Sequence, residues 1–364
     1  MEDMRSFNAN LFPILRYLAI FCVMCLHFTG YMRIYVPDHA VGISVLRSVI
    51  DFYQPTVVLF SISGFLISAS IDGLGIDNLK LYLKKRFLRL YPELWVSMLF
   101  YIICIYCVVP ELLDNSIFKW IITQGIGIAA TPSCMQEFAT GSINGSMWYI
   151  TVLIQLYILL FIFKLFIKNN NSRYVYGFIF IAFTICNLTA FYINPVLPPI
   201  AQKLLERSFV PYAIWFFIGV LFHDLGLYQK RYSILFLIIL IMIHFLIKTF
   251  KIFDFGYYTG LLSGMAVAAI AILVATFTIK KTYYSRLISF CLKLKKTDIS
   301  YGMYLNHWLF INLLIHYKIY EKIHWGICFV LYILATIIVA FVGHIITSKL
   351  IDKLSSIRIK MRYS

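Results

Sequence analysis

Charged side chains are scarce in this sequence, and acidic ones are the scarcest. Only 13% of the 364 residues are charged, and Asp and Glu together number 16. Soluble globular domains usually carry roughly twice that charged share. The composition therefore excludes an ordinary water-soluble enzyme, whereas 61% hydrophobic side chains and a mean hydropathy of +0.84 suit a chain surrounded by lipid.

Long polar inserts, low-complexity tracts, Pro/Ser-rich linkers and convincing internal repeats are also missing. We therefore expect one membrane domain, residues 1–364, with its chemistry inside the helix bundle and no appended soluble domain. The longest loop, from about Val109 to Ser146, is expected to face outward as a lid or a connection.

The eight cysteines include two CxxC-like pairs, but each lies in its own apolar stretch without a matching pair to complete a metal site. Cys22 with Cys25 and Cys104 with Cys107 each lie within an apolar stretch, so we expect packing roles and no metal.

Apolar stretches long enough to cross a membrane dominate the chain. A hydrocarbon core of about 30 Å needs roughly 20 apolar residues in a helix, because unpaired backbone groups are not solvated there. Ten segments qualify: Leu11–Tyr31, Pro55–Ile71, Tyr91–Val109, Met147–Ile167, Tyr174–Ile193, Phe209–Phe222, Tyr232–Ile247, Gly256–Ile279, Ile299–Ile315 and Gly326–Thr347. An eleventh, Ile117–Ala130, is marginally apolar and predicts a re-entrant or interfacial piece. The expected fold is an all-α polytopic bundle of about ten transmembrane helices.

The basic residues predict the orientation of these helices. With the N terminus in the cytoplasm, 23 of the 32 Lys and Arg residues fall on the inner side. This asymmetry is the positive-inside rule, and it places both termini in the cytoplasm. It also accounts for the net charge of +16 without a nucleic-acid partner.

Two ionisable residues, Arg16 and His27, stand in the first apolar segment. Such side chains are costly in a membrane and are often functional. Their spacing of eleven residues returns to within about 20° of the same helix face, about 16 Å further along it. A neutral His27 has the chemistry of a general base, and Arg16 that of an anion-binding group. Alternatively, His27 is a structural histidine and Arg16 a snorkelling anchor.

A second basic site lies in the inner loop before the third apolar segment. Arg86 and Arg89 are three residues apart and share a face if the segment is helical, so their guanidinium groups can clamp phosphates. An ordinary patch that contacts anionic lipid headgroups is the simpler alternative.

Polar aromatic residues mark two further segments. Tyr301, Tyr304 and His307 follow at intervals of three in the ninth segment and are candidates to line a substrate cavity. Trp148 opens the fourth segment, where it can contact a sugar or anchor the helix at the membrane boundary.

In order along the chain, these motifs resemble those of the acyltransferase family 3 membrane proteins. The matches are Arg16 with ten residues before His27, Phe60–Ile67 with its SGFLI sequence, Arg86–Pro92 (RFLRLYP), Met147–Tyr157, and Ser300–His307. One departure is that Ile150 to Gln155 contains no carboxylate, where many members carry an acidic pair.

The resemblance implies ten core helices in a bacterial inner membrane and O-acylation of a surface polysaccharide, a lipopolysaccharide or a similar glycan, with cytoplasmic acyl-CoA as donor. It implies catalysis by His27 with Arg16 as its motif partner, and handling of the CoA donor by Arg86 and Arg89. We expect an acetyl group, a glycan or lipid-linked glycan acceptor, and direct or acyl-histidine transfer. The rivals are a transporter or flippase of a lipid-linked glycan, and a membrane scaffold.

Overall fold

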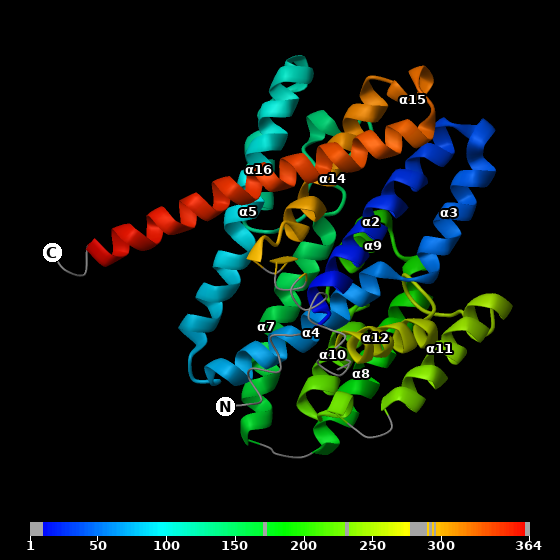
Figure 1. The fold of residues 1–364 in the computed structure, drawn as a ribbon, viewed down its shortest axis with the longest axis vertical. Helices are drawn as coiled ribbons and strands as arrows, with labels where there is room; N and C mark the ends of the chain where they lie inside the picture. The colour runs from blue at the N-terminus through cyan, green and yellow to red at the C-terminus, as the bar shows by residue number, and fades with distance from the viewer. Residues whose placement is uncertain are drawn as a thin grey trace. The chain divides into compact units, whose positions relative to one another are not determined.

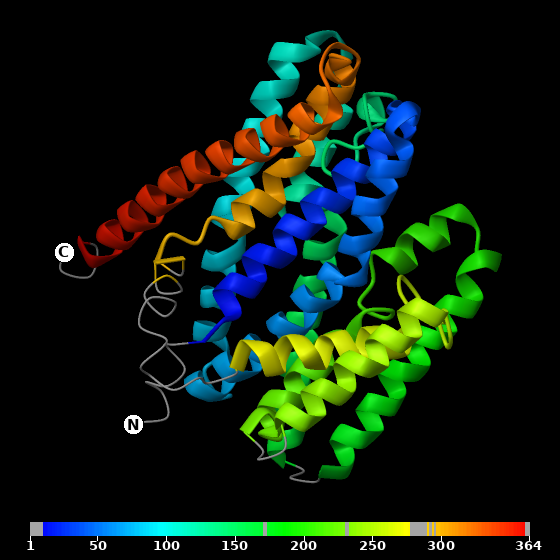
Figure 2. The ribbon, with the colours of Figure 1, turned by 45° about the vertical axis from the view of Figure 1, so that its right-hand side comes forward.

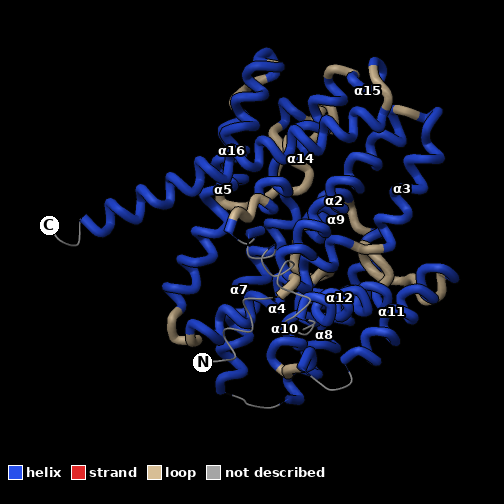
Figure 3. The backbone as a smooth tube through the Cα atoms, in the orientation of Figure 1, coloured by secondary structure: helices blue, strands red, loops and turns tan. Residues whose placement is uncertain are grey.

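The computed structural model describes residues 10–169, 173–229, 233–276, 290, 293, 294 and 296–360. Throughout these residues the regular secondary structure is helical and no strand occurs (Figure 3). The expected all-α class is confirmed.

Each of the ten expected segments contains a helix. These are α2 (Phe12–Tyr35), α4 (Pro55–Leu74), α5 (Leu79–Val108), α7 (Met147–Asn169), α8 (Arg173–Ile193), α10 (Ala213–Asp224), α11 (Ser233–Phe250), α12 (Leu261–Thr276), α14 (Ser300–His316) and α16 (Trp325–Lys360). Seven stretches of the described chain are long and apolar enough to cross a membrane, and α10 and α12 are shorter apolar helices. The protein is thus a multi-pass membrane protein, while the count of ten crossings stays a prediction.

The inner loop expected before the third apolar segment is helical. The helix α5 begins at Leu79, so Lys84 to Tyr91 lie in its first half, and Pro92 lies inside it. Apolar length finds only the part of a helix that is solvated by lipid, whereas hydrogen bonding continues wherever the backbone allows it. For the same reason α16 extends thirteen residues beyond Thr347, to Lys360.

Short helices occupy the connections. They are α3 (Ala40–Phe52), α6 (Ser116–Gly125), α9 (Pro199–Glu206) and α15 (Ile319–Lys322), with 3₁₀ turns η1 (Pro37–His39), η2 (Pro110–Leu112), η3 (Ser133–Met135), η4 (Asn194–Val196) and η5 (Leu227–Gln229). The ten-residue α6 forms the first part of the marginal segment Ile117–Ala130, which the sequence analysis left out of the crossings.

The chain divides into two compact units, each considered separately here. Unit 1 comprises Met1–Cys22, Val49–Leu79 and Thr151–Lys296, and unit 2 comprises Val23–Ser48, Lys80–Ile150 and Thr297–Ser364. In unit 1, α4 packs against α10 and α12, α10 also contacts α8, and α11 covers α12. In unit 2, α14 and α16 lie side by side, seen as the orange and red helices of Figures 1 and 2. The expectation of a single domain stays a prediction.

Two glycines set the contact between α4 and α10 in unit 1. A Cβ added at Gly64 would lie 1.9 Å from the backbone oxygen of Phe216, and one added at Gly219 would lie 2.0 Å from that of Ser61. Backbone therefore lies against backbone from both sides, a close approach that small residues at a helix interface permit.

Replacing Gly219 by Ala should destabilise the protein by about 1–3 kcal/mol, because the added methyl group meets a backbone atom that cannot rotate away. The thermal unfolding midpoint of the purified protein in detergent measures this effect. Gly73→Ala in α4 is the matched control, since its Cβ would meet no atom within 4 Å. An equal or higher midpoint for Gly219→Ala would contradict the close contact.

Candidate functional site

Two histidines far apart in the sequence meet in unit 2. His27 Nδ1 on α2 lies 2.8 Å from His307 Nε2 on α14, a separation of 280 residues along the chain. The ring planes differ by 4° and the ring centres are 5.1 Å apart. That centre distance is close to the N–N distance plus the two ring radii, so the rings lie edge to edge in a shared plane. This arrangement is an imidazole–imidazole hydrogen bond.

The hydrogen bonds of His307 determine which nitrogen of His27 is free. His307 Nδ1 lies 2.7 Å from the backbone oxygen of Tyr304, which can only accept, so Nδ1 carries the proton. In the neutral ring Nε2 is then an acceptor, and His27 Nδ1 donates to it. The remaining nitrogen, Nε2 of a neutral His27, therefore keeps its lone pair available as a base.

Aromatic rings enclose this pair. The Trp308 ring meets the His27 ring edge-on with centres 4.8 Å apart, and the Tyr31 ring meets Trp308 edge-on at 5.7 Å. His307 is fully buried, whereas His27 is partly exposed. His307 is thus held in the core of unit 2, and His27 lies at the edge of that core.

The segment before α7 is tied to α14 by polar side chains. Trp308 Nε1 donates to Thr140 Oγ1 at 2.9 Å, and Asn144 Nδ2 donates to the Leu305 oxygen at 3.0 Å. Tyr304 donates from its hydroxyl to the Ser146 oxygen at 2.8 Å. These hydrogen bonds between the segment before α7 and α14 therefore hold the Trp308 ring in place beside His27.

Gly145 allows this contact to be close. A Cβ at this position would lie 2.2 Å from the Trp308 ring, so any larger residue would displace the indole. The stretch from Thr140 to Ser146, which contains Gly145, is consequently a packing surface for the ring beside His27.

Of the two arginines of α5, Arg89 lies near the first turn of α14, whereas Arg86 contacts a ring of its own helix. Arg89 forms an ion pair with Asp298 at 2.7 Å, and its guanidinium lies 5.9 Å from the centre of the Tyr301 ring. Arg86 lies 5.8 Å from the centre of the Tyr82 ring. Because α5 is helical here, the expectation that the arginines share a face is confirmed. An incoming phosphate would have to share Arg89 with the Asp298 carboxylate, or displace that carboxylate from Arg89.

The helix α14 runs from the surroundings of Arg89 to the pair formed by His27 and His307. Tyr301 near Arg89 precedes His307 by six residues, or about 9 Å along the axis. Tyr301, Tyr304 and His307 are all buried, so α14 brings the expected polar residues into the core of unit 2.

Arg16 and Trp148 are the two remaining residues that the sequence analysis selected. The helix α2 is continuous from Phe12 to Tyr35 and carries both Arg16 and His27, as expected, although Arg16 belongs to unit 1. Trp148 is partly buried near the start of α7, and its ring meets that of Tyr149 edge-on. Roles for Arg16 and Trp148 remain predictions.

Comparison with protein families supplies the missing context. The model of the acyltransferase domain of family 3 matches residues 12–345, nearly the whole chain. The chain belongs to acyltransferase family 3. It is a membrane acyltransferase, and the resemblance stated from the sequence is confirmed. No curated protein and no solved structure gave a significant match.

The sequence analysis of this acyltransferase missed one acidic residue of the site region. Glu93 on α5 is 6% exposed, and its Oε1 lies where a Cβ on Gly302 of α14 would approach to 2.7 Å. An acidic residue in an apolar segment is itself a signal for a functional or paired group. That signal was present in the third apolar segment.

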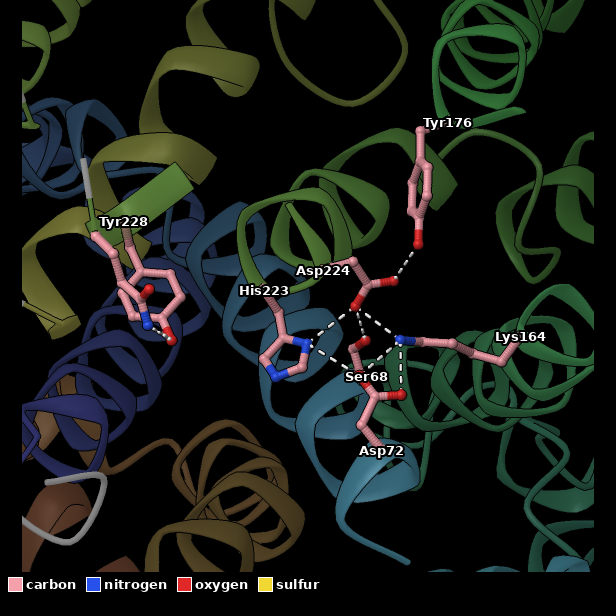
Figure 4. A network of polar contacts seen from close by, with 8 residues as sticks. Ser68, Asp72, Lys164, Tyr176, His223, Asp224 and Tyr228 are labelled. Atoms are coloured by element: carbon pink, nitrogen blue, oxygen red, sulfur yellow. Dashed lines mark hydrogen bonds and ion pairs between the residues drawn. The ribbon is translucent and has the colours of Figure 1, made fainter. Parts of the chain in front are cut away.

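A polar cluster in unit 1 also escaped the sequence analysis. The buried Asp224 carboxylate accepts from Lys164 at 2.7 Å, from His223 at 2.9 Å, from Tyr176 at 3.0 Å and from Ser68 (Figure 4). Helices α4, α7, α8 and α10 contribute these residues. The cluster therefore links four helices of the acyltransferase through one carboxylate.

The same cluster contains a set of atoms with metal-like spacing, formed by Asp72, His223 and Asp224. Lys164 Nζ already lies within 3.0 Å of both carboxylates. A divalent cation would have to displace this ammonium group. The four cysteines of the two CxxC-like pairs lie outside any such set within the described residues.

Replacing His307 by Leu should lower kcat for acyl transfer roughly 100-fold, because His27 Nδ1 loses its acceptor and the ring its fixed orientation. His307→Gln should retain more activity, since its amide oxygen can accept the same hydrogen bond. Turnover is measured in membranes at matched protein levels and across a pH series, where only the Leu variant should change the profile. Equal activity of both variants with the wild type would contradict a positioning role.

Proposed function

We propose that this acyltransferase transfers an acyl group, expected to be acetyl, from cytoplasmic acyl-CoA to a hydroxyl of a cell-surface glycan or its lipid-linked precursor. The observation that carries the proposal is the hydrogen-bond chain from the Tyr304 carbonyl through His307 to His27. It leaves a basic nitrogen at a partly exposed position in a chain whose family performs acyl transfer.

In the proposed reaction, His27 Nε2 takes the proton of the acceptor hydroxyl as the oxygen attacks the thioester carbonyl. The carbon–sulfur bond then breaks and CoA leaves as a thiolate, which takes the proton back from His27. Proton transfer of this kind typically contributes about 10²–10⁴-fold to a rate. Attack by Nε2 on the thioester, giving an acyl-histidine, would use the same lone pair.

His307 supports either route from behind. A protonated His27 can still donate from Nδ1 to His307 Nε2, so the hydrogen bond of 2.8 Å is kept when the charge appears. The Tyr304 carbonyl holds the His307 tautomer through the cycle. The imidazole of His27 therefore changes charge without changing its hydrogen-bond partner.

The donor is proposed to bind with its phosphates near Arg86 and Arg89. Arg89 is substantially exposed, with 40% of its side-chain surface accessible, and Tyr301 beside it leads along α14 toward His307. Permanently charged, planar guanidinium groups suit phosphate binding.

Replacing His27 by Ala should abolish acylation of the glycan, since no other described group supplies the free imidazole nitrogen at this place. Surface glycans from cells with either form are compared by NMR and mass spectrometry for the loss of an acetyl or larger acyl substituent. His39→Ala, which truncates an exposed histidine, is the matched control. Unchanged acylation at an equal protein level would remove His27 from the mechanism.

Replacing both Arg86 and Arg89 by Ala should raise the KM for acyl-CoA at least about tenfold, because two phosphate-binding charges are lost. The double change Lys84→Ala and Lys85→Ala on the same helix is the control for general loss of basic charge, since both lysines are exposed. The KM is measured in membranes with a labelled donor. An unchanged value would eliminate the phosphate clamp and leave an anionic-lipid patch.

A further inference from the structure

Unit 1 contains an open cavity of about 560 Å³. It lies where α8, α10, α11 and α12 begin or end, and its lining consists of Asp51, of five residues within 191–212 and of seven within 248–260. Its volume falls within the roughly 300–1,000 Å³ typical of small-molecule sites. No residue discussed for acyl transfer lines it.

Three carboxylates and one ammonium group belong to the lining of the cavity. Asp51, Glu206 and Asp254 are acidic, and Lys248 lies 4.0 Å from Asp51. The cavity therefore has an excess of negative charge, in a chain whose overall charge is +16. Ionised carboxylates only accept hydrogen bonds, so they favour a ligand rich in donors and disfavour an anion.

A further acceptor lies in the wall. Asn194 Oδ1 is buried and has no hydrogen-bond partner among the described residues. A buried amide oxygen without a partner costs free energy that a ligand hydroxyl would recover. The cavity thus offers more acceptor positions than its own donors occupy.

Aromatic rings supply the apolar part of the surface. Tyr212 and Tyr257 line the cavity with ring centres 5.9 Å apart and planes at 83°, and Phe191 adds a third ring. Flat apolar faces beside hydrogen-bonding groups match a pyranose, which presents C–H faces and hydroxyl edges.

Hydrogen bonds between the loops around the cavity hold its shape. Asn187 donates to the Pro211 oxygen at 2.7 Å and accepts from the Tyr257 N–H at 3.2 Å, so one side chain holds both loops. Tyr258 shares a hydrogen bond of 2.9 Å with Thr56. Both loops lie on the outer side in the orientation predicted from the basic residues.

We propose that this cavity binds a neutral oligosaccharide segment of the glycan acceptor and rejects glycans that carry phosphate or carboxylate groups. The carboxylates and Asn194 Oδ1 accept from sugar hydroxyls, Lys248 donates, and Tyr257 packs against a ring. The acceptor role rests on the proposed function, whereas binding itself needs no acyl transfer.

The test uses the full-length protein in nanodiscs and two probes of equal length, isomaltotriose and trigalacturonic acid. Saturation-transfer NMR and titration should show the neutral trimer binding at least tenfold more tightly than the anionic one. Tyr257→Ala should weaken the neutral trimer about tenfold, whereas Ile252→Ala, in the same loop but outside the lining, should not. The double change Glu206→Gln and Asp254→Asn should narrow the gap between the probes.

Thermal unfolding midpoints show whether each variant is folded. A second variant, Tyr257→Phe, keeps the aromatic ring and should therefore still bind isomaltotriose. Binding of neither probe, equal binding of both, or the same affinity in Tyr257→Ala would overturn the inference. Binding of Mg²⁺ that the double change abolishes, without sugar binding, would assign the cavity to a cation and overturn it too.

The His27→Ala variant separates this inference from the proposed function. It should bind isomaltotriose like the wild type while losing acyl transfer. Acyl transfer that persists in Tyr257→Ala with an unchanged acceptor KM would refute the cavity and leave the role of His27 intact.

Discussion

The geometry of the candidate site depends on one backbone carbonyl. The Tyr304 oxygen accepts from His307 Nδ1, which makes His307 Nε2 an acceptor and directs the proton of His27 to Nδ1. A side chain could be replaced by mutation at this point, but a carbonyl inside a helix is supplied by the fold itself. The tautomer of His27 is therefore a consequence of α14 being a helix at Tyr304.

Much of the architecture could be predicted from apolar length. All ten expected segments contain helices, because satisfying the backbone in lipid requires helices of about that length. Helix ends outside the lipid were less accessible to this reasoning. The first half of α5 carries Lys84, Lys85, Arg86 and Arg89, and it looks like a loop to a hydropathy argument although it is helical.

Contacts between helices in the candidate site were harder to predict from the sequence than the helices themselves. His27 and His307 were each selected from the sequence because of their segments, but periodicity describes neighbours on one helix and says nothing of a partner 280 residues away. The ion pair of Arg89 with Asp298 and the cluster around Asp224 were missed for this reason. Glu93 was missed although its place in an apolar segment was visible.

The pairing of His27 with His307 also has a consequence for biosynthesis. His27 leaves the ribosome 280 residues before its acceptor His307, and most of the other described helices lie between the two. At translation rates of about 5–20 residues per second, the first imidazole waits roughly 14 to 56 seconds for its partner. A nascent chain that stops before α14 carries His27 with no acceptor to fix its proton. The pair of histidines is thus completed only after α14 has been synthesised.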